Sequence, residues 1–156
     1  MLHVVLYQPE IPHNTGAIGR LCLATGARLH LIHPLGFSLD DKHLKRVGLD
    51  YWHQVDVRQW QTWAELRAAE TGRGSEWFYV ECGGAQAHWD AKLTAEDLYL
   101  VFGPETRGIP ASLMEAERIL TIPMQADGTR SLNLATAAGI VMYEALRQRA
   151  LAGIVP

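Results

Sequence analysis

Cysteine is scarce in this chain: Cys22 and Cys82 are the only two, and they stand far apart. A disulfide framework and a CxxC zinc site are therefore not indicated. Long hydrophobic runs are also missing, since none approaches the roughly 20 residues of a membrane-spanning helix. The segment from Met1 to Val4 lacks the basic flank and the small-residue cleavage site of a signal peptide. We expect a cytoplasmic protein that does not associate with membranes.

An excess of positive charge is absent as well. The net charge is −3 over 156 residues, which argues against a protein that coats nucleic acid through bulk electrostatics. Residues 1–50 carry +1, residues 51–100 carry −4, and residues 101–156 are neutral. Any nucleic-acid surface would therefore be local and assembled from the two ends of the chain. The length fits one compact domain, which we expect to span residues 1–156.

Several motifs of common enzymes are missing. The sequence contains no GxGxxG or GxxxxGK[ST] phosphate-binding loop, no HExxH zinc motif and no GxSxG nucleophile elbow. Dinucleotide enzymes, P-loop enzymes and ordinary hydrolases all lose support from these absences.

Short apolar runs alternate with helical patterns, which predicts an α/β fold with a mostly parallel sheet and helices on both faces. The predicted strands are Leu2–Tyr7, Leu29–Ile32, Gln54–Arg58, Trp77–Cys82, Leu98–Phe102 and Ile119–Ile122. The predicted helices are a first one from an N-cap at Asn14 to Gly26, then Asp40–Val47, Trp60–Glu70, Pro110–Glu117 and Leu132–Ala150.

The last of these helices is apolar on more than one face. One face contains Leu134, Ala138 and Val141, and a second contains Ile140 and Tyr143. Such a helix needs covering on two sides. A partner subunit and burial within the same chain both remain open from this pattern.

Three loops carry more polar residues than a simple connection needs. The first, "EIPHNTGAIGR" from Glu10 to Arg20, enters a helix, and helix N-termini attract anions. Asn14 would cap this helix and Arg20 would reach the same space, although a plain strand-to-helix connection would also explain the residues. These two side chains are candidates for a site only if other loops join them.

The second loop lies within "YLVFGPETRGIPASL", where Gly103 to Pro110 contains two glycines, two prolines, a glutamate and an arginine. Gly103 leaves no side chain between the backbone and a ligand. Glu105 and Arg107 could pair with each other, or they could point at a polar ligand.

The third loop lies within "IPMQADGTRSLNLATA" and leads into the last helix. Ser131 or Asn133 alone would suffice as an N-cap, so a group of Arg130, Ser131 and Asn133 exceeds what a cap requires. All three loops follow predicted strands, and open α/β sheets bind ligands at the carboxyl ends of their strands. We therefore expect the three loops to converge on one crevice.

The stretches "NTGAIGRLC", "FGPETRGIP" and "IPM…RSLNLATAAGIVMYEA" resemble, in order and spacing, the three motifs of SPOUT-class RNA 2′-O-methyltransferases. The resemblance covers Met1 to about Gly153. "LYQPEIPHNTG" and "HPLGFSLDDKHLKRVGLDYW" are most similar to the group that methylates the tRNA wobble nucleotide, cytidine or uridine 34. The resemblance implies a C-terminal trefoil knot and S-adenosylmethionine as methyl donor without a metal. It also implies a tRNA anticodon stem-loop as substrate and a homodimer formed through the C-terminal helix, including Tyr143.

The resemblance also implies roles for individual residues. A central role falls to Arg20, either as the base or as a charge that stabilises the developing alkoxide or holds a phosphate. The catalytic set would be Asn14, Arg20, Glu105, Ser131 and Asn133. The cofactor-binding set would be Val80, Gly103, Gly108, Ile122, Met124, Ser131 and Leu132.

RNA contacts would come from basic residues near the pocket and on a short helix. Arg107 and Arg130 are expected beside the pocket. A basic stripe is expected at i, i+3 and i+4 on the short helix, although nearby acids could make it an ordinary solvated face; its residues are Lys42, Lys45 and Arg46. Unpaired bases stack on aromatic rings, and the candidate rings, which could equally pack in the core, are Tyr51, Trp52 and Trp89.

Other functions remain possible. A nucleotide-binding domain that is not a methyltransferase is disfavoured by the missing glycine fingerprint. A non-catalytic RNA-binding protein on the same fold would not need the whole catalytic set. A related enzyme that 2′-O-methylates another tRNA position or rRNA stays open, because the motifs specify the chemistry better than the substrate.

Overall fold

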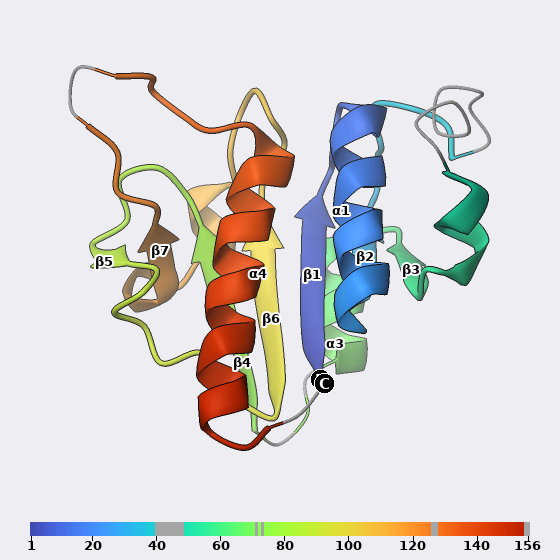
Figure 1. Cartoon of the computed structure of the whole chain (residues 1–156). Coiled ribbons are helices and arrows are strands. Elements are labelled where there is room, and N and C mark those ends of the chain that lie inside the picture. The colour runs from blue at the N-terminus through green and yellow to red at the C-terminus, as the bar shows by residue number, and fades with distance from the viewer. Residues whose placement is uncertain (40–48, 71, 73, 126–127, 155–156) are drawn as a thin grey trace.

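The computed structural model describes residues 1–39, 49–70, 72, 74–125 and 128–154. Its centre is a parallel sheet of seven strands in the order β3-β2-β1-β6-β4-β7-β5 (Figure 1). The strands are β1 (Leu2–Tyr7), β2 (Arg28–Ile32), β3 (Val57–Trp60), β4 (Ser75–Val80), β5 (Gln86–Ala87), β6 (Asp97–Phe102) and β7 (Ile119–Thr121). The mostly parallel α/β class predicted from the sequence is therefore confirmed.

Helices cover both faces of the sheet. Helices α1 (Pro12–Thr25) and α4 (Leu134–Leu151) lie side by side on one face, and α3 (Trp63–Glu70) lies on the other (Figure 1). A 3₁₀ helix, η1 (Leu49–Gln54), packs near α1. No helix within the described ranges is long and apolar enough to cross a membrane.

The apolar runs of the sequence arise because the central strands are buried on both faces. Successive side chains of a strand point to opposite faces. Val4 on β1 and Leu100 on β6 belong to the core beneath α1 and α4, whereas Val5 and Val101 pack in the core on the α3 side with Leu66. Parallel strands buried in this way have no polar alternation.

The topology brings the three polar loops, which follow β1, β6 and β7, to the same end of the sheet. Strand β6 lies between β1 and β4, and β4 lies between β6 and β7. All these strands are parallel, so the segments that leave β1, β4, β6 and β7 emerge at the same end. After β7 the chain returns across this end to begin α4 beside α1 (Figure 1).

Some predicted elements were wrong. The segment expected as a helix from Pro110 to Glu117 forms two short 3₁₀ turns, η2 (Ala111–Leu113) and η3 (Ala116–Arg118). Between them Met114 and Glu115 are extended, with ψ of 141° and 117°. This extended stretch allows Leu113 and Met114 to pack against the core on the α3 side.

Other boundaries shifted. The strand expected at Gln54–Arg58 is β3, which ends at Trp60, so α3 begins at Trp63 and not at Trp60. The two-residue strand β5 was not predicted, because two residues carry no recognisable pattern. The predicted helix Asp40–Val47 lies outside the described residues.

Candidate functional site

A cavity of about 670 Å³ lies at the carboxyl ends of β4, β6 and β7, next to the start of α4. The three loops singled out in the sequence all contribute to its walls, so the expected convergence is confirmed. The predicted site residues among those that line it are Asn14, Val80, Gly103, Glu105, Arg107, Gly108, Ile122, Met124, Arg130, Ser131, Leu132 and Asn133. Their roles stay predictions.

The loop after β6 closes tightly on itself. A Cβ on Gly103 would lie 2.6 Å from the carbonyl carbon of Gly108 and from the backbone nitrogen of Ile109. Gly108 has φ of +72°, a conformation that residues with side chains rarely adopt. Both glycines are therefore required by the turn itself, in addition to any close approach of a ligand.

Glu105 fastens this loop to the start of α1. Its carboxylate accepts hydrogen bonds from the backbone N–H groups of Glu10 (2.8 Å) and Ile11 (3.2 Å) and from the side-chain amide of Asn14 (3.0 Å). Hydrogen bonds also run in the opposite direction, because the Glu10 carboxylate accepts from the backbone N–H (3.0 Å) and from the hydroxyl (2.9 Å) of Thr106 in the loop after β6. These contacts indicate that Glu105 orders the loop after β6 against the start of α1.

The prediction that Asn14 caps α1 was wrong. The helix begins at Pro12, and its N-cap Ile11 provides no side-chain hydrogen bond. The carboxylate of Glu105 instead accepts from N–H groups at this helix start, where negative charge is favourable.

Asn14 is one link in a chain of side-chain hydrogen bonds. Its Oδ1 accepts from Nδ2 of Asn133 (2.9 Å), and Oδ1 of Asn133 caps α4 by accepting from the N–H groups of Ala135 (2.9 Å) and Thr136 (3.2 Å). Each amide orientation is fixed, since Glu105 can only accept and backbone N–H can only donate. Asn133 is thus an N-cap, and it also joins the starts of α1 and α4 through Asn14.

Two guanidinium groups stand at the cavity. Arg107 is exposed, with Nε 3.5 Å from the Glu10 carboxylate and Nη2 3.4 Å from the side-chain oxygen of Gln8. The Glu105–Arg107 pairing considered from the sequence is not formed, because Glu105 is engaged with α1. Arg130 is exposed beside Ser131. These groups place two positive charges at a cavity that the carboxylates of Glu81 and Glu105 also line.

Arg20 is not among the residues that line the cavity. Its exposed guanidinium lies 4.7 Å from the ring centre of Tyr51, whose hydroxyl donates to the carbonyl of Gly16 (3.2 Å). This stacking places the Arg20 guanidinium against η1.

The aromatic candidates differ in exposure. Tyr51 and Trp52 are half-buried and pack against the main core, and a Cβ on Gly19 would lie 2.5 Å from the Trp52 ring. Trp89 is 53% exposed and makes an edge contact with His88. The predicted basic stripe, Lys42, Lys45 and Arg46, lies outside the described residues.

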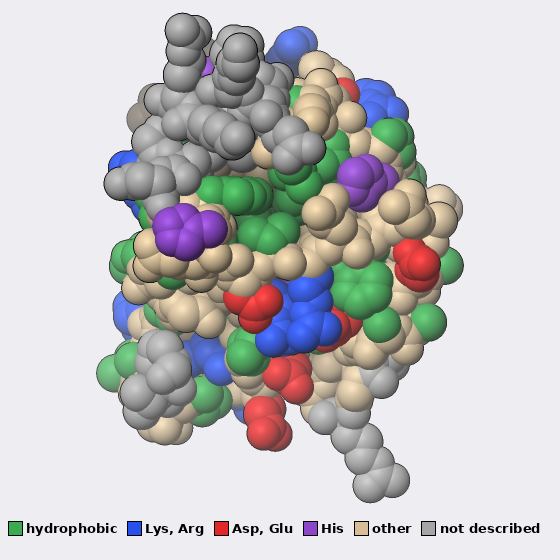
Figure 2. All heavy atoms as spheres, turned by 90° about the vertical axis from the view of Figure 1, so that its right-hand side faces the viewer, with side chains coloured by type: hydrophobic (Ala, Val, Ile, Leu, Met, Phe, Trp, Pro, Cys, Tyr) green, Lys and Arg blue, Asp and Glu red, His purple; other side chains and the backbone are tan. Residues whose placement is uncertain are grey.

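The described residues at the β3 edge of the sheet carry charges of both signs. Figure 2 shows basic and acidic side chains lying next to one another there. Arg28 pairs with Asp56 at 2.7 Å, and Arg58 lies 3.7 Å from Glu70. This mixture agrees with the expectation from the sequence that any nucleic-acid surface is local.

Sequence reasoning missed two carboxylates at the site. Glu10 returns the bond to the loop after β6, and Glu81, directly after β4, accepts a hydrogen bond from the backbone N–H of Ile109. The available signal was their position, because both follow a strand at its carboxyl end.

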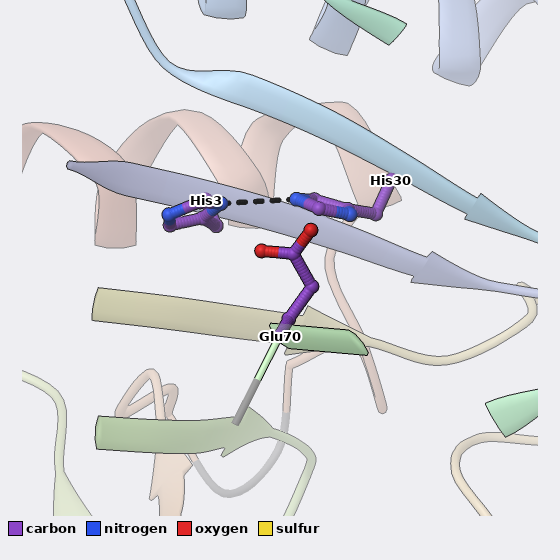
Figure 3. Close-up of side chains that lie close together, drawn as sticks. All are labelled: His3, His30 and Glu70. Carbon is purple, nitrogen blue, oxygen red and sulfur yellow. Dashed lines mark hydrogen bonds between the residues drawn. The ribbon is translucent and has the colours of Figure 1, made fainter. Parts of the chain in front are cut away.

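A second polar cluster lies beneath the sheet on the α3 side, where His3, His30 and Glu70 meet (Figure 3). Nδ1 of His3 lies 3.0 Å from Nε2 of His30, and the Trp60 indole N–H donates to Nδ1 of His30 (3.0 Å). Because an indole can only donate, the proton of neutral His30 is on Nε2 and points to His3. Nε2 of His3 then carries a proton and faces Asp97 at 3.6 Å.

This arrangement is a hydrogen-bonded relay and does not offer the donor set of a metal site. A metal at the centre of the cluster would have to bind Nε2 of His30. This nitrogen carries the proton of the ring, because the indole N–H of Trp60 donates to Nδ1, so Nε2 has no lone pair for a metal. Burial lowers the pKa of His3 to about 4 and that of His30 to about 3, so both imidazoles are neutral near pH 7. The two rings hydrogen-bond to each other inside the core, while Nε2 of His3 has no hydrogen-bond partner among the described residues.

Known proteins resemble the chain over most of its length. Residues 1–143 match the SpoU rRNA Methylase family. The tRNA (cytidine(34)-2′-O)-methyltransferase of Escherichia coli (strain K12) is 46% identical and is covered to 98%, with 99% of this chain covered.

Solved structures agree. One from work on 2-OH methylation of C/U34 on tRNA has a TM-score of 0.88 at 47% identity, with 98% of this chain and 97% of that chain covered. The methyltransferase AviRb of Streptomyces viridochromogenes, in complex with AdoMet, has a TM-score of 0.81 at 27% identity, with 97% of this chain and 61% of that chain covered. The fold class expected from the sequence resemblance is confirmed by these matches.

Proposed function

The chain belongs to the SpoU rRNA Methylase family, and from this premise we propose that it transfers a methyl group from S-adenosylmethionine to the ribose 2′-hydroxyl of the tRNA wobble nucleotide. The relatives that support the substrate carry cytidine 34 of tRNA in their names and align over nearly the full chain. A tRNA substrate would place the protein in the cytoplasm.

The observation that carries the proposal is the cavity in which all three motif loops meet. Its volume of about 670 Å³ suits a ligand of the size of S-adenosylmethionine. Val80, Ile122 and Leu132 give it apolar walls for an adenine ring, and the Gly103–Gly108 turn exposes backbone groups to the ligand. The residues present therefore fit the cofactor.

The bound cofactor would supply an electrophilic methyl group on a sulfonium, and its transfer is an in-line displacement that needs no metal. The task of the protein is to hold the 2′-oxygen against that methyl group. Good positioning lowers a barrier by at most about 7–11 kcal/mol. The Glu105–Asn14–Asn133 chain serves this task, because it holds the two loops and both helix starts in one fixed arrangement.

The charged side chains at the cavity would orient both substrates. Arg107 and Arg130, which line the cavity, would bind the phosphates beside the target ribose or the carboxylate of the cofactor. Ser131 offers a hydroxyl at the start of α4 for either ligand. Removal of the 2′ proton would contribute a further factor of about 10²–10⁴.

Arg20, whose guanidinium lies against η1, would act on the 2′-oxygen as a base or as a stabilising charge, or would hold the neighbouring phosphate. Stacking on Tyr51 limits the directions that its guanidinium can take. Arg20→Lys and Arg20→Ala test an electrostatic role. Lysine keeps the positive charge, so a purely electrostatic role would leave partial methyl transfer in Arg20→Lys and almost none in Arg20→Ala.

We propose a homodimer that forms through α4. Val141, Met142 and Ala145 are buried against the sheet, whereas Ile140 is 37%, Tyr143 is 55% and Leu151 is 77% exposed. Leu23, on the neighbouring helix α1, is 37% exposed. Burial within one chain thus covers only part of the apolar surface of α4, and light scattering of the purified protein would test for a second copy. A monomer at micromolar concentration would contradict the proposal.

The decisive experiment is a methyl-transfer assay with labelled S-adenosylmethionine and unmodified tRNA, followed by nuclease digestion and mass spectrometry. Label on the 2′-oxygen of nucleotide 34 is expected. Label at another tRNA position or only on rRNA would overturn the substrate and keep the chemistry. If the protein failed to bind S-adenosylmethionine, the methyltransferase function would be refuted.

A further inference from the structure

Glu81 lines the cavity at the carboxyl end of β4. It follows the last residue of β4, and its backbone N–H donates to the carbonyl of Leu120 (3.0 Å), which ties the end of β4 to β7. Its side chain is half-buried and lines the cavity. The carboxylate is therefore held at the point where β4, β7 and the loop after β6 meet.

The carboxylate of Glu81 lies against the backbone of the Gly103–Ile109 loop. Oε1 accepts a hydrogen bond from the N–H of Ile109. Both carboxylate oxygens would be 3.0 Å from a Cβ on Gly108, so the absence of a side chain there is what admits the carboxylate.

Two glutamates, Glu81 and Glu105, line the cavity, and Glu10 lies next to Glu105 on the loop after β1; the three carboxylates differ in the number of hydrogen bonds that they accept. A carboxylate offers about four acceptor positions. Glu105 receives three donors, and Glu10 receives two from Thr106 with Arg107 nearby. Across the described residues Glu81 receives only the Ile109 N–H and forms no ion pair. Its second oxygen is left with acceptor capacity at the cavity.

We propose that Glu81 is a cofactor-binding residue whose Oε2 accepts a hydrogen bond from a hydroxyl or ammonium donor of S-adenosylmethionine. The inference rests on the proposed function, because it assumes that this cofactor occupies the cavity. The cofactor carries such donors on its ribose and on its amino-acid end, and its sulfonium is positive. Arg107 and Arg130 match its anionic group, whereas Glu81 is the carboxylate with free acceptor capacity for its donors.

The test is the substitution Glu81→Gln, with Glu76→Gln on the preceding strand β4 as the matched control. Glutamine can still accept from the Ile109 N–H through its oxygen, but its NH₂ group replaces Oε2 and would face the donor of the ligand. Calorimetric titration of S-adenosylmethionine should show binding about 10-fold or more weaker in Glu81→Gln. Glu76 pairs with Arg118 outside the cavity, so its variant should bind as the wild type does.

Two smaller ligands identify the group that is bound. 5′-Methylthioadenosine has the ribose hydroxyls and lacks the ammonium, and adenine has neither. Weaker binding of S-adenosylmethionine and 5′-methylthioadenosine, with adenine unchanged, would assign Glu81 to the ribose. Weaker binding of S-adenosylmethionine alone would assign it to the ammonium, and either result supports the proposal.

Two results would overturn the inference. Unchanged affinity for S-adenosylmethionine in Glu81→Gln would leave Glu81 as a clamp on Ile109 only. An equal loss for all three ligands would mean that the loop had shifted, with the same conclusion. Failure of the wild type to bind S-adenosylmethionine is a different result, since it refutes the proposed function itself.

Discussion

The buried pair His3 and His30 should make the protein lose stability on mild acidification. His3 is 3% exposed and His30 is fully buried, and burial lowers their pKa values from 6.5 to about 4 and about 3. Between pH 6.5 and about 4 the unfolded chain therefore binds more protons than the folded chain. Stability must fall as the pH falls through this window.

The magnitude follows from these pKa values. Each histidine contributes a slope of up to about 1.4 kcal/mol per pH unit, so the pair should remove about 4 kcal/mol between pH 7 and pH 5. Such a loss is a large part of the roughly 5–15 kcal/mol that stabilises an ordinary domain. Carboxylates with lowered pKa values, Asp97 and Glu144, lose their contribution at lower pH, below their ordinary values of 3.8 and 4.5.

Urea denaturation at pH 7, 6 and 5 measures this slope. The double variant His3→Gln/His30→Gln should be less stable at pH 7 but should show a much flatter dependence on pH. His13→Gln, which changes an exposed histidine, should keep the wild-type slope. A wild-type slope near zero, or an unchanged slope in the double variant, would refute the reasoning.

Substitutions at three positions, Glu105, Asn133 and Gly103, test the site, each read by urea denaturation, by cofactor titration and by the methyl-transfer assay. Glu105→Gln places an NH₂ group among three donors and should cost about 1–3 kcal/mol of stability and weaken methyl transfer; an unaltered variant would contradict the ordering role. Asn133→Asp keeps the α4 cap but sets a carboxylate against the buried Oδ1 of Asn14, so methyl transfer should fall and stability should drop by about 1–3 kcal/mol; Asn133→Ala loses the cap itself, which is worth about 1 kcal/mol. Gly103→Ala should weaken cofactor binding, because the new Cβ would lie 2.6 Å from backbone atoms of Gly108 and Ile109. The control Gly139→Ala in α4, whose Cβ would lie 3.6 Å from the nearest atom, should be tolerated. Equal cofactor affinity in the two variants would show that the turn adapts to the added Cβ.

Much of the sheet could be predicted because its strands are buried on both faces. Leu2–Tyr7 and Leu98–Phe102 appear as unbroken apolar runs, and the polar loops that follow strands at their carboxyl ends marked the site. The last helix was predicted to within two residues at its start, where Asn133 is the cap. Local pattern was sufficient wherever neighbours in sequence determine burial and capping.

Prediction failed where a distant residue decides the local structure. Asn14 looks like an N-cap, but the start of α1 is served by Glu105, which is 91 residues away from Asn14. The stretch after Pro110 has a helical composition, yet packing of Leu113 and Met114 on the core extends it. Contacts of this range leave no periodic signal in the sequence.

The long-range contacts also explain why the fold and the site depend on each other. Glu105 reaches back to α1, Asn133 reaches Asn14 over 119 residues, and Glu81 holds Ile109. Each of these bonds joins segments that become neighbours only when β6 and β7 have taken their places in the sheet. The cavity therefore exists only in the fully folded chain, and a ligand that binds there must stabilise the whole fold by mass action. By the same linkage, a substitution that loosens one of these contacts should reduce cofactor affinity even when the altered residue does not touch the cofactor.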